Sequence, residues 1–281
     1  MSEPFDTILS LGRKDIEKAL IEDLDSGDSR VVAFGELSHA YAPGFRALLG
    51  RLIPDLISRK YNKLALELRT SFSDDLLRFQ ESGDIAELAR PICSTTKHMY
   101  CQNFWNAVLE NSLTPNLNFH QDYTDLLQLF QQNHFDLSLI DRPIGANQHL
   151  DRDVYMSGIV RQLLSKGGRM CSLGGARHLI VDHSRTPTSY VERIRNFTST
   201  FTVAGFEWRP FPPPFDSDFE PDLSMLMAIT SPIYLSKSKM GKLGEMVAYT
   251  VPTLGQTEKP VLYSSWDAIV FFPLVVEPLT I

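Results

Sequence analysis

Four acid–base residues occur where the sequence predicts strand ends. Glu36 and His39 lie three positions apart, directly after an apolar run, and His178 follows a second run that ends in glycines. Glu67 interrupts a third run, 64–68, where a carboxylate must be paired, protonated or bound to a ligand. Imidazole transfers protons near neutral pH, and a neighbouring carboxylate can orient it. We therefore predict a catalytic group of His39, Glu36, Glu67 and His178.

Arginines near the same positions can bind an anionic group or a developing oxyanion. The sequence offers four candidates for substrate binding: Arg46, Arg69, Arg142 and Arg177. Structural roles remain open alternatives. Glu67 can form a buried salt bridge with Arg69 or Arg46, and each histidine can be a core residue bonded to the backbone.

Three more charged residues have open roles. Asp141 ends another apolar run and can pair with the adjacent Arg142. Arg152 and Asp153 begin an amphipathic helix, where they either form a solvated face or turn back to support the site.

Hydrophobic periodicity predicts the elements that position these residues. Apolar runs predict strands at 30–34, 63–68, 135–140, 169–173, 200–204, 225–229 and 268–272. Helical spacing predicts helices at 15–24, 43–60 (broken or kinked at Pro54), 73–88 (interrupted near Gly83), 99–109, 123–130 and 151–164. This alternation indicates an α/β fold, with a central, mostly parallel sheet flanked by helices.

The chain is expected to form one α/β domain over 1–281, with a small helical cap inserted at about 90–135. Ligands of open parallel sheets bind at the carboxyl ends of the strands. If the strands are neighbours, the predicted catalytic residues and arginines converge on one crevice.

Composition excludes several classes of function. The 281 residues are 43% hydrophobic and 22% charged, as in ordinary globular proteins, and the net charge of −7 argues against a nucleic-acid partner. No apolar run is long enough for a signal peptide or a membrane span, so we expect a cytoplasmic protein without a membrane partner. The odd count of cysteines, Cys93, Cys101 and Cys171, fits free thiols in a reducing compartment.

Common catalytic motifs are absent. The sequence has no Gly-x-Ser-x-Gly elbow, no phosphate-binding or dinucleotide-binding glycine loop, and no His-Glu-x-x-His zinc helix.

Residues 31–39 resemble the opening strand and Gly-Glu-x-x-His loop of the erythromycin esterase family, although Ala40 stands where that family usually has glycine. Further segments resemble family motifs in the same order along nearly the whole chain: Phe45-Arg46, 64–67, Arg152-Asp153-x-x-Met156, 173–178 and 266–270. The wider superfamily also includes Tiki-type metalloproteases and haem-binding iron-uptake proteins.

The resemblance implies a hydrolase that cleaves an ester or lactone of a small molecule or natural product without a cofactor. His39 would activate water, Glu36 or Glu67 would orient it, and His178 would protonate the leaving group or hold the carbonyl oxygen. Arg46, Arg69 or Arg142 would stabilise the oxyanion.

Other functions remain open for the same residues. His39, His178 and Glu67, with Glu36 as base or fourth ligand, could bind a divalent metal such as Mn, Fe, Co or Zn. The protein could also be a biosynthetic cyclase or lyase, or a haem or iron carrier. The sequence specifies neither the substrate nor the oligomeric state.

Overall fold

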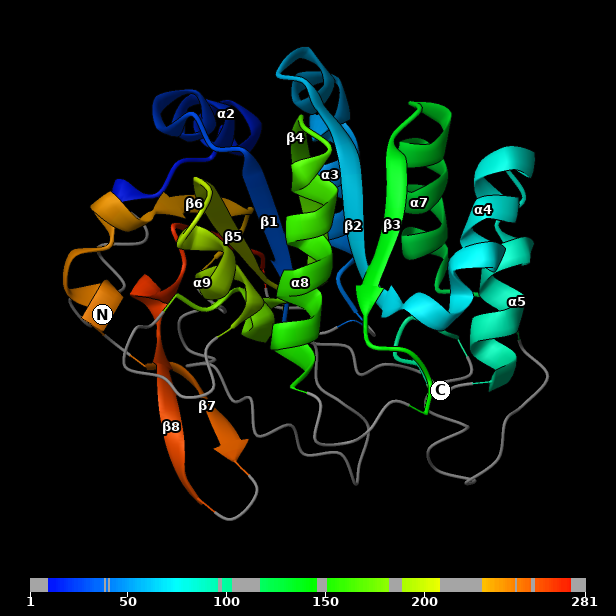
Figure 1. The fold of residues 1–281 in the computed structure, drawn as a ribbon. Helices are drawn as coiled ribbons and strands as arrows, with labels where there is room; N and C mark the ends of the chain where they lie inside the picture. Colours follow the sequence, from blue (N-terminus) through cyan, green and yellow to red (C-terminus); the bar gives the residue numbers. More distant parts are fainter. Residues whose placement is uncertain are drawn as a thin grey trace.

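The computed structural model describes residues 10–37, 39, 41–95, 98–102, 117–145, 151–181, 189–207, 229–245, 247–253 and 256–273. Within these ranges the central element is a seven-stranded sheet of order β3-β2-β4-β1-β5-β9-β6 (Figure 1). Its edge strand β6 pairs antiparallel with β9, and the other pairings are parallel. The predicted α/β fold with a mostly parallel sheet is therefore confirmed.

The sheet strands are β1 (Val31–Glu36), β2 (Tyr61–Arg69), β3 (Asp136–Asp141), β4 (Arg169–Gly175), β5 (Thr200–Phe206), β6 (Ile233–Ser236) and β9 (Ala268–Phe271). A separate antiparallel hairpin consists of β7 (Val247–Thr253) and β8 (Gln256–Leu262). The α-helices are α2 (Ile16–Gly27), α3 (Pro43–Ser58), α4 (Ser73–Ser82), α5 (Ala86–Thr95), α7 (Gln121–Gln132), α8 (Arg152–Ser165) and α9 (Tyr190–Arg195). Five short 3₁₀ turns complete the described elements: Thr70–Phe72, Ala176–Leu179, Lys237–Lys239, Gly241–Glu245 and Tyr263–Ser265.

Helices cover both faces of the sheet, which explains why its strands are largely apolar. Every residue of β1 is buried, and successive side chains enter different cores. Val32 and Phe34 belong to the core that α2, α3, α4, α5 and α7 also line, whereas Val31 and Ala33 belong to the core that α8 and α9 line. A strand buried on both faces is typical of a parallel sheet in a three-layer protein.

Strand order brings the predicted site residues to one edge. The strands β2, β4 and β1 are neighbours, and Glu36 at the end of β1 lies beside Gly175 at the end of β4. Gly174 is needed here because an added Cβ atom would lie 2.5 Å from Glu67 Oε2. The glycines at the end of β4 therefore leave room for the glutamate of β2.

Several predicted elements need correction. The helix α3 continues through Pro54 without a break. Residues 99–102 form a turn and an isolated bridge, not the start of a helix, and 103–109 lie outside the described residues. Most of the predicted strand 225–229 also lies outside them, and Ile229 is not in a strand. The sequence interpretation missed β6, which is only four residues long, and the β7–β8 hairpin, whose strands are interrupted by polar residues.

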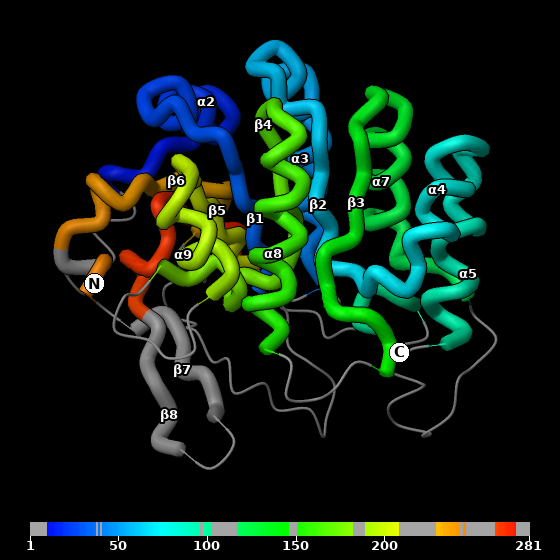
Figure 2. The backbone as a smooth tube through the Cα atoms, in the orientation of Figure 1, coloured from blue at the N-terminus to red at the C-terminus, as the bar shows by residue number. Residues whose placement is uncertain are grey.

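The predicted cap at about 90–135 has a mixed outcome. Its helix α7 packs against α3 and contributes to the core on that face of the sheet, so it belongs to the flanking layer (Figure 2). Residues 103–116 lie outside the described part of the chain. The division into one domain with a cap therefore stays a prediction.

The interpretation of all cysteines as free thiols is wrong. Cys93 at the end of α5 forms a disulfide with Cys101, with 5.7 Å between their Cα atoms, while Cys171 is free and buried in β4. The cysteine argument for a reducing compartment therefore no longer holds. Among the described helices, none combines the length and apolarity that a bilayer crossing requires.

Candidate active site

The first part of the site is an ion-pair cluster around Glu36 at the end of β1. The Glu36 carboxylate is fully buried and accepts hydrogen bonds from Arg46 Nε at 2.6 Å and Arg46 Nη2 at 3.2 Å. Its Oε2 also lies 3.0 Å from Nδ1 of His39. Arg46 binds the His39 carbonyl oxygen at 2.6 Å and Asp122 of α7 at 2.8 Å. The arginine thus fixes both the glutamate and the loop that carries the histidine.

Glu67 of β2 occupies the centre of the site. Its Oε2 accepts the backbone N–H of Gly175 at 2.5 Å, and its Oε1 accepts Arg152 Nη2 at 2.6 Å. Arg152 begins α8 and also holds both oxygens of Asp141, at 2.6 and 2.9 Å. The guanidinium therefore joins the ends of β2 and β3.

A second histidine–carboxylate pair completes the site. His178, in the 3₁₀ turn after β4, has Nδ1 2.9 Å from Asp153 Oδ1. Asp153 also accepts the backbone N–H of Tyr190, the first residue of α9, at 2.8 Å. The Nε2 atom of His178 lies 3.4 Å from Glu67 Oε1, and that of His39 lies 3.8 Å from the same oxygen. The structure thus brings the four predicted catalytic residues together, although their catalytic role stays a prediction.

Charge shifts the protonation of these groups. Burial by itself lowers the pKa of the His39 imidazole, but the hydrogen bond to Glu36 and the nearby Glu67 carboxylate outweigh burial and raise that pKa to about 9. Burial raises the pKa of Glu67, yet the charges of His178, His39 and Arg152 dominate and hold it well below its usual range. For Glu36, Arg46 and His39 likewise overcome burial and lower the pKa. The ordinary pKa that the sequence predicts for His39 is therefore wrong, and this histidine is mainly protonated at neutral pH.

Aromatic rings cover the His39 side of the site. The Tyr100 ring lies 4.6 Å from the His39 ring and is stacked between His98, at 5.0 Å, and Tyr123, at 3.9 Å, measured between ring centroids. Burial and the positive charge of His39 lower the pKa of His98 to about 3, so His98 is neutral. From the sequence, His98 and Tyr100 fall in the predicted cap and could contact the substrate, which stays a prediction. Tyr123 and Asp122 lacked any sequence signal beyond their place on an amphipathic helix.

The predicted substrate-binding arginines have different outcomes. Arg46 is 1% exposed and its guanidinium faces Glu36, Asp122 and the His39 carbonyl, so its predicted substrate contact is corrected to an internal role. Arg69 and Arg142 are half-buried near the ends of β2 and β3, and Arg177 is exposed. The cation at the centre is instead Arg152, whose side chain is 33% exposed. Arg152 and Asp153 do turn back to the site, as one of the two interpretations of the α8 sequence predicts.

The residues around Glu67 do not favour a metal ion. Arg152 Nη2 lies 2.6 Å from Glu67 Oε1, and its Nη1 lies 3.4 Å from His178 Nε2. A guanidinium therefore faces the same atoms that an ion would need as ligands. Within the described ranges, no set of three or more His, Cys, Asp or Glu residues is placed to hold a metal ion.

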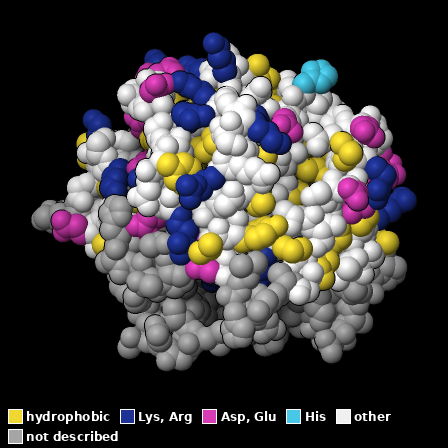
Figure 3. Space-filling view, in the orientation of Figure 1, with side chains coloured by type: hydrophobic (Ala, Val, Ile, Leu, Met, Phe, Trp, Pro, Cys, Tyr) yellow, Lys and Arg dark blue, Asp and Glu magenta, His cyan; other side chains and the backbone are white. Residues whose placement is uncertain are grey.

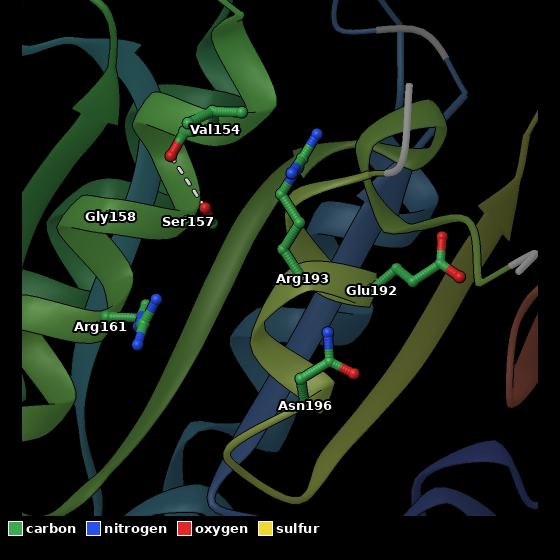
Figure 4. Close-up of a pocket in the computed structure, with 7 residues that line it drawn as sticks. All are labelled: Val154, Ser157, Gly158, Arg161, Glu192, Arg193 and Asn196. Atoms are coloured by element: carbon green, nitrogen blue, oxygen red, sulfur yellow. Dashed lines mark hydrogen bonds between the residues drawn. The ribbon is translucent and has the colours of Figure 1, made fainter. Parts of the chain in front are cut away.

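A cavity of about 600 Å³ lies between α8 and α9, apart from the four His and Glu residues (Figure 4). Its walls carry Val154, Ser157, Gly158, Arg161, Glu192, Arg193 and Asn196. On the face shown in Figure 3, basic and acidic side chains of the described residues are interspersed.

Comparison with known proteins supports the fold. No protein-family model and no curated protein matches the sequence. A crystal structure of a Bacillus cereus protein matches with a TM-score of 0.57 and 11% identity, over 98% of each chain. A mutant of the erythromycin esterase EreC in its open conformation matches with a TM-score of 0.55 and 11% identity, over 92% of this chain and 93% of that one.

The haem-bound ChaN protein of Campylobacter jejuni also matches, with a TM-score of 0.45, 11% identity and 91% coverage of both chains. Because that score lies below 0.5, the fold comparison rests on the first two structures. The chain has the fold of an erythromycin esterase, so the resemblance found in the sequence motifs is confirmed at the level of the fold.

Proposed function

We propose that this protein is a hydrolase that cleaves an ester or lactone bond of a small molecule, with His39 as the general base and no cofactor. The observation that carries the proposal is the orientation of His39. Its Nδ1 is fixed by Glu36 at 3.0 Å, and its Nε2 faces Glu67 from a side chain that is 16% exposed. A carboxylate on one imidazole nitrogen leaves the other nitrogen to take a proton from water.

The remaining groups have complementary roles. The water attacks the substrate carbonyl carbon and the neutral form of His39 takes its proton, while Glu36 stabilises the imidazolium that forms. Because the pKa of His39 is about 9, the neutral form is the minority at neutral pH, and we expect kcat/KM to rise as the pH approaches 9. Arg152, which is one-third exposed beside Glu67 and His178, stabilises the oxyanion. His178 then protonates the departing alkoxide, and its Nδ1 contact with Asp153 keeps the ring oriented. An ester-cleaving activity agrees with the erythromycin esterase structure among those of similar fold.

The His39→Asn variant tests the assignment. We expect kcat/KM to fall about 10²–10⁴-fold, the usual contribution of general-base catalysis, on p-nitrophenyl butyrate or on erythromycin as the lactone probe. The matched control is His134→Asn, because His134 is exposed and has a φ of 59°, which asparagine tolerates. Full activity in His39→Asn would overturn the role of His39. A wild-type protein that cleaves no ester or lactone would overturn the hydrolase proposal.

A further inference from the structure

The segment that covers His39 is tied to the fold by covalent and backbone contacts. Tyr100 lies directly before Cys101, which is bonded to Cys93 across a sequence separation of eight. Cys101 forms a bridge with Phe119, and the Tyr100 carbonyl accepts the N–H of His120 at 2.9 Å. The position of the Tyr100 ring is therefore set by α5 on one side and by the start of α7 on the other.

The Tyr100 ring contacts both halves of the Glu36–His39 arrangement. It lies 4.6 Å from the His39 ring, and the Arg46 guanidinium carbon lies 5.4 Å from its centroid. Tyr123 stacks behind it at 3.9 Å and lies 5.1 Å from the same guanidinium carbon. Cation–π contacts of this kind are strongest when they are desolvated, and both tyrosines and Arg46 are fully buried. The ring thus closes the cluster that orients His39.

The ring of Tyr100 makes these contacts, not its hydroxyl group. The hydroxyls of Tyr100 and Tyr123 are buried, and in the described part of the chain neither bonds to Glu36, His39 or Arg46. A hydroxyl that bonds none of these three residues does not orient His39, so replacement of Tyr100 by phenylalanine preserves the ring contacts with His39 and Arg46 that we describe.

We infer that Tyr100 is a positioning residue for His39, and that the Cys93–Cys101 disulfide holds its ring in place. The inference deepens the proposed function. Its activity test depends on that function, whereas its NMR test does not. A dithiol reductant breaks the sulfur–sulfur bond by supplying two electrons and two protons, which yields two cysteine thiols and an oxidised reductant. The link between α5 and Tyr100 is then lost, and the segment gains conformational freedom.

Substitutions at Tyr100 separate the ring from the hydroxyl. We expect Tyr100→Ala to lower kcat about 100-fold, as small misplacements of catalytic groups do, with a much smaller change in KM. Tyr100→Phe should keep wild-type kcat because it retains the ring that contacts His39 and Arg46. A large loss of kcat in Tyr100→Phe would overturn the inference, since it would show that the hydroxyl itself takes part in the reaction.

NMR tests the positioning without any substrate. The Tyr100 ring, whose centroid lies 4.6 Å from that of His39 at an interplanar angle of 49°, displaces the Cε1 proton resonance of His39 through its ring current, and His39→Asn identifies that signal. We expect the resonance to shift in Tyr100→Ala, in the Cys93→Ala/Cys101→Ala double variant and after treatment with dithiothreitol, and to stay in Tyr100→Phe. Cys171→Ala is the matched control, because Cys171 is buried in β4 and forms no disulfide.

The outcomes separate this inference from the proposed function. One outcome is that the protein has no esterase activity, while its His39 resonance still changes in position when the disulfide is broken and in titration midpoint when the Tyr100 ring is removed. That result would overturn the hydrolase proposal and support the positioning role of Tyr100. An unchanged His39 resonance in the folded double variant and in the reduced protein would overturn the role of the disulfide. Because Tyr100→Ala also removes the ring current, the role of the ring is tested there by the pH titration of the His39 resonance: a midpoint that stays at the wild-type value in the folded variant would overturn it, since a displaced imidazole loses part of its contact with Glu36 and Glu67.

Discussion

The Glu36–His39 pair and the Asp153–His178 pair approach the same oxygen of Glu67 but are held by different parts of the fold. In the first pair the two residues are three positions apart, and a buried arginine neutralises the carboxylate. In the second pair the residues lie 25 positions apart on α8 and the turn after β4, and a backbone N–H from α9 fixes the carboxylate. The Glu36 side chain is fully buried, whereas that of Asp153 is 17% exposed.

The difference shows two ways to orient an imidazole. Charge pairing at Glu36 makes the first histidine dependent on Arg46, because neither ion can remain alone in the core. Backbone hydrogen bonding at Asp153 makes the second histidine dependent on the placement of two helices. Substitutions in the first pair and in the second pair should therefore lower the free energy of unfolding by different amounts.

The largest expected effect comes from neutralising the carboxylates. Glu36→Gln leaves the Arg46 guanidinium buried without its main counter-charge, so the free energy of unfolding should fall by about 3–5 kcal/mol. Asp153→Asn keeps an acceptor oxygen for the Tyr190 N–H and should cost only about 1 kcal/mol. Urea denaturation of both variants measures the two values. Equal losses would show that the pairs are held in the same way.

The position of the Glu36–His39 pair at a strand end could be predicted from the sequence. The counter-ion of Glu36, which is Arg46, could not. Glu36 and His39 follow an apolar run at a short spacing, so local pattern places them correctly. The sequence offers Arg46 as a substrate ligand or as a salt-bridge partner of Glu67, because its position on α3 does not show which way the guanidinium points; its partner is Glu36. Burial of a cation follows only from the packing of α3 against β1 and α7.

The dependence of stability on pH should distinguish the two histidines. The pKa of His39 is about 9 in the folded protein, against about 6.5 for an unfolded histidine. Because the folded value is the higher one, the contribution of His39 is fully present below pH 6.5 and is lost as the pH rises through about 9. The difference corresponds to about 3 kcal/mol.

Urea denaturation at pH 6.5 and pH 9.5 checks this expectation. The difference between the two pH values should shrink by that amount in His39→Asn, while lysine and tyrosine titrations affect both proteins equally. The carboxylates of Glu36 and Glu67, whose pKa values are lowered, remain ionised over the whole window and do not contribute. An identical pH dependence in wild type and variant would contradict the raised pKa.

The second pair shows where sequence pattern fails. Asp153 contacts His178 through the placement of α8 and α9, and α9 itself was not predicted. Arg152 and Asp153 carried two equally good interpretations, a solvated helix face or support for the site. Only the approach of the α8 N-terminus to β2 and β3 decides between them, and contacts across more than 80 positions of sequence leave no local signal.

Gly174→Ala should disturb the carboxylate that the two pairs share. The added Cβ atom would lie 2.5 Å from Glu67 Oε2 and 3.0 Å from Glu67 Cβ, so the glutamate must move. We expect a loss of about 1–3 kcal/mol in unfolding free energy, as for other overpacked sites. Gly158→Ala in α8 is the matched control: its Cβ meets nothing within 4 Å, and alanine should stabilise the helix by about 0.5–1 kcal/mol. A neutral Gly174→Ala would show that Glu67 has room to shift.

The smallest effect tests the backbone support of Asp153. Ser189 caps α9 by accepting the N–H of Glu192 at 3.1 Å, and its hydroxyl donates to the Ile180 carbonyl at 2.5 Å. Ser189→Ala should cost about 1 kcal/mol, the usual value of such a cap, whereas the exposed Ser58→Ala should stay within about 0.5 kcal/mol. Because Tyr190 directly follows the cap, Ser189→Ala should shift the Cε1 proton resonance of His178 and leave that of His39 unchanged. A shift of both resonances would mean that the two pairs are coupled through Glu67 and do not respond independently.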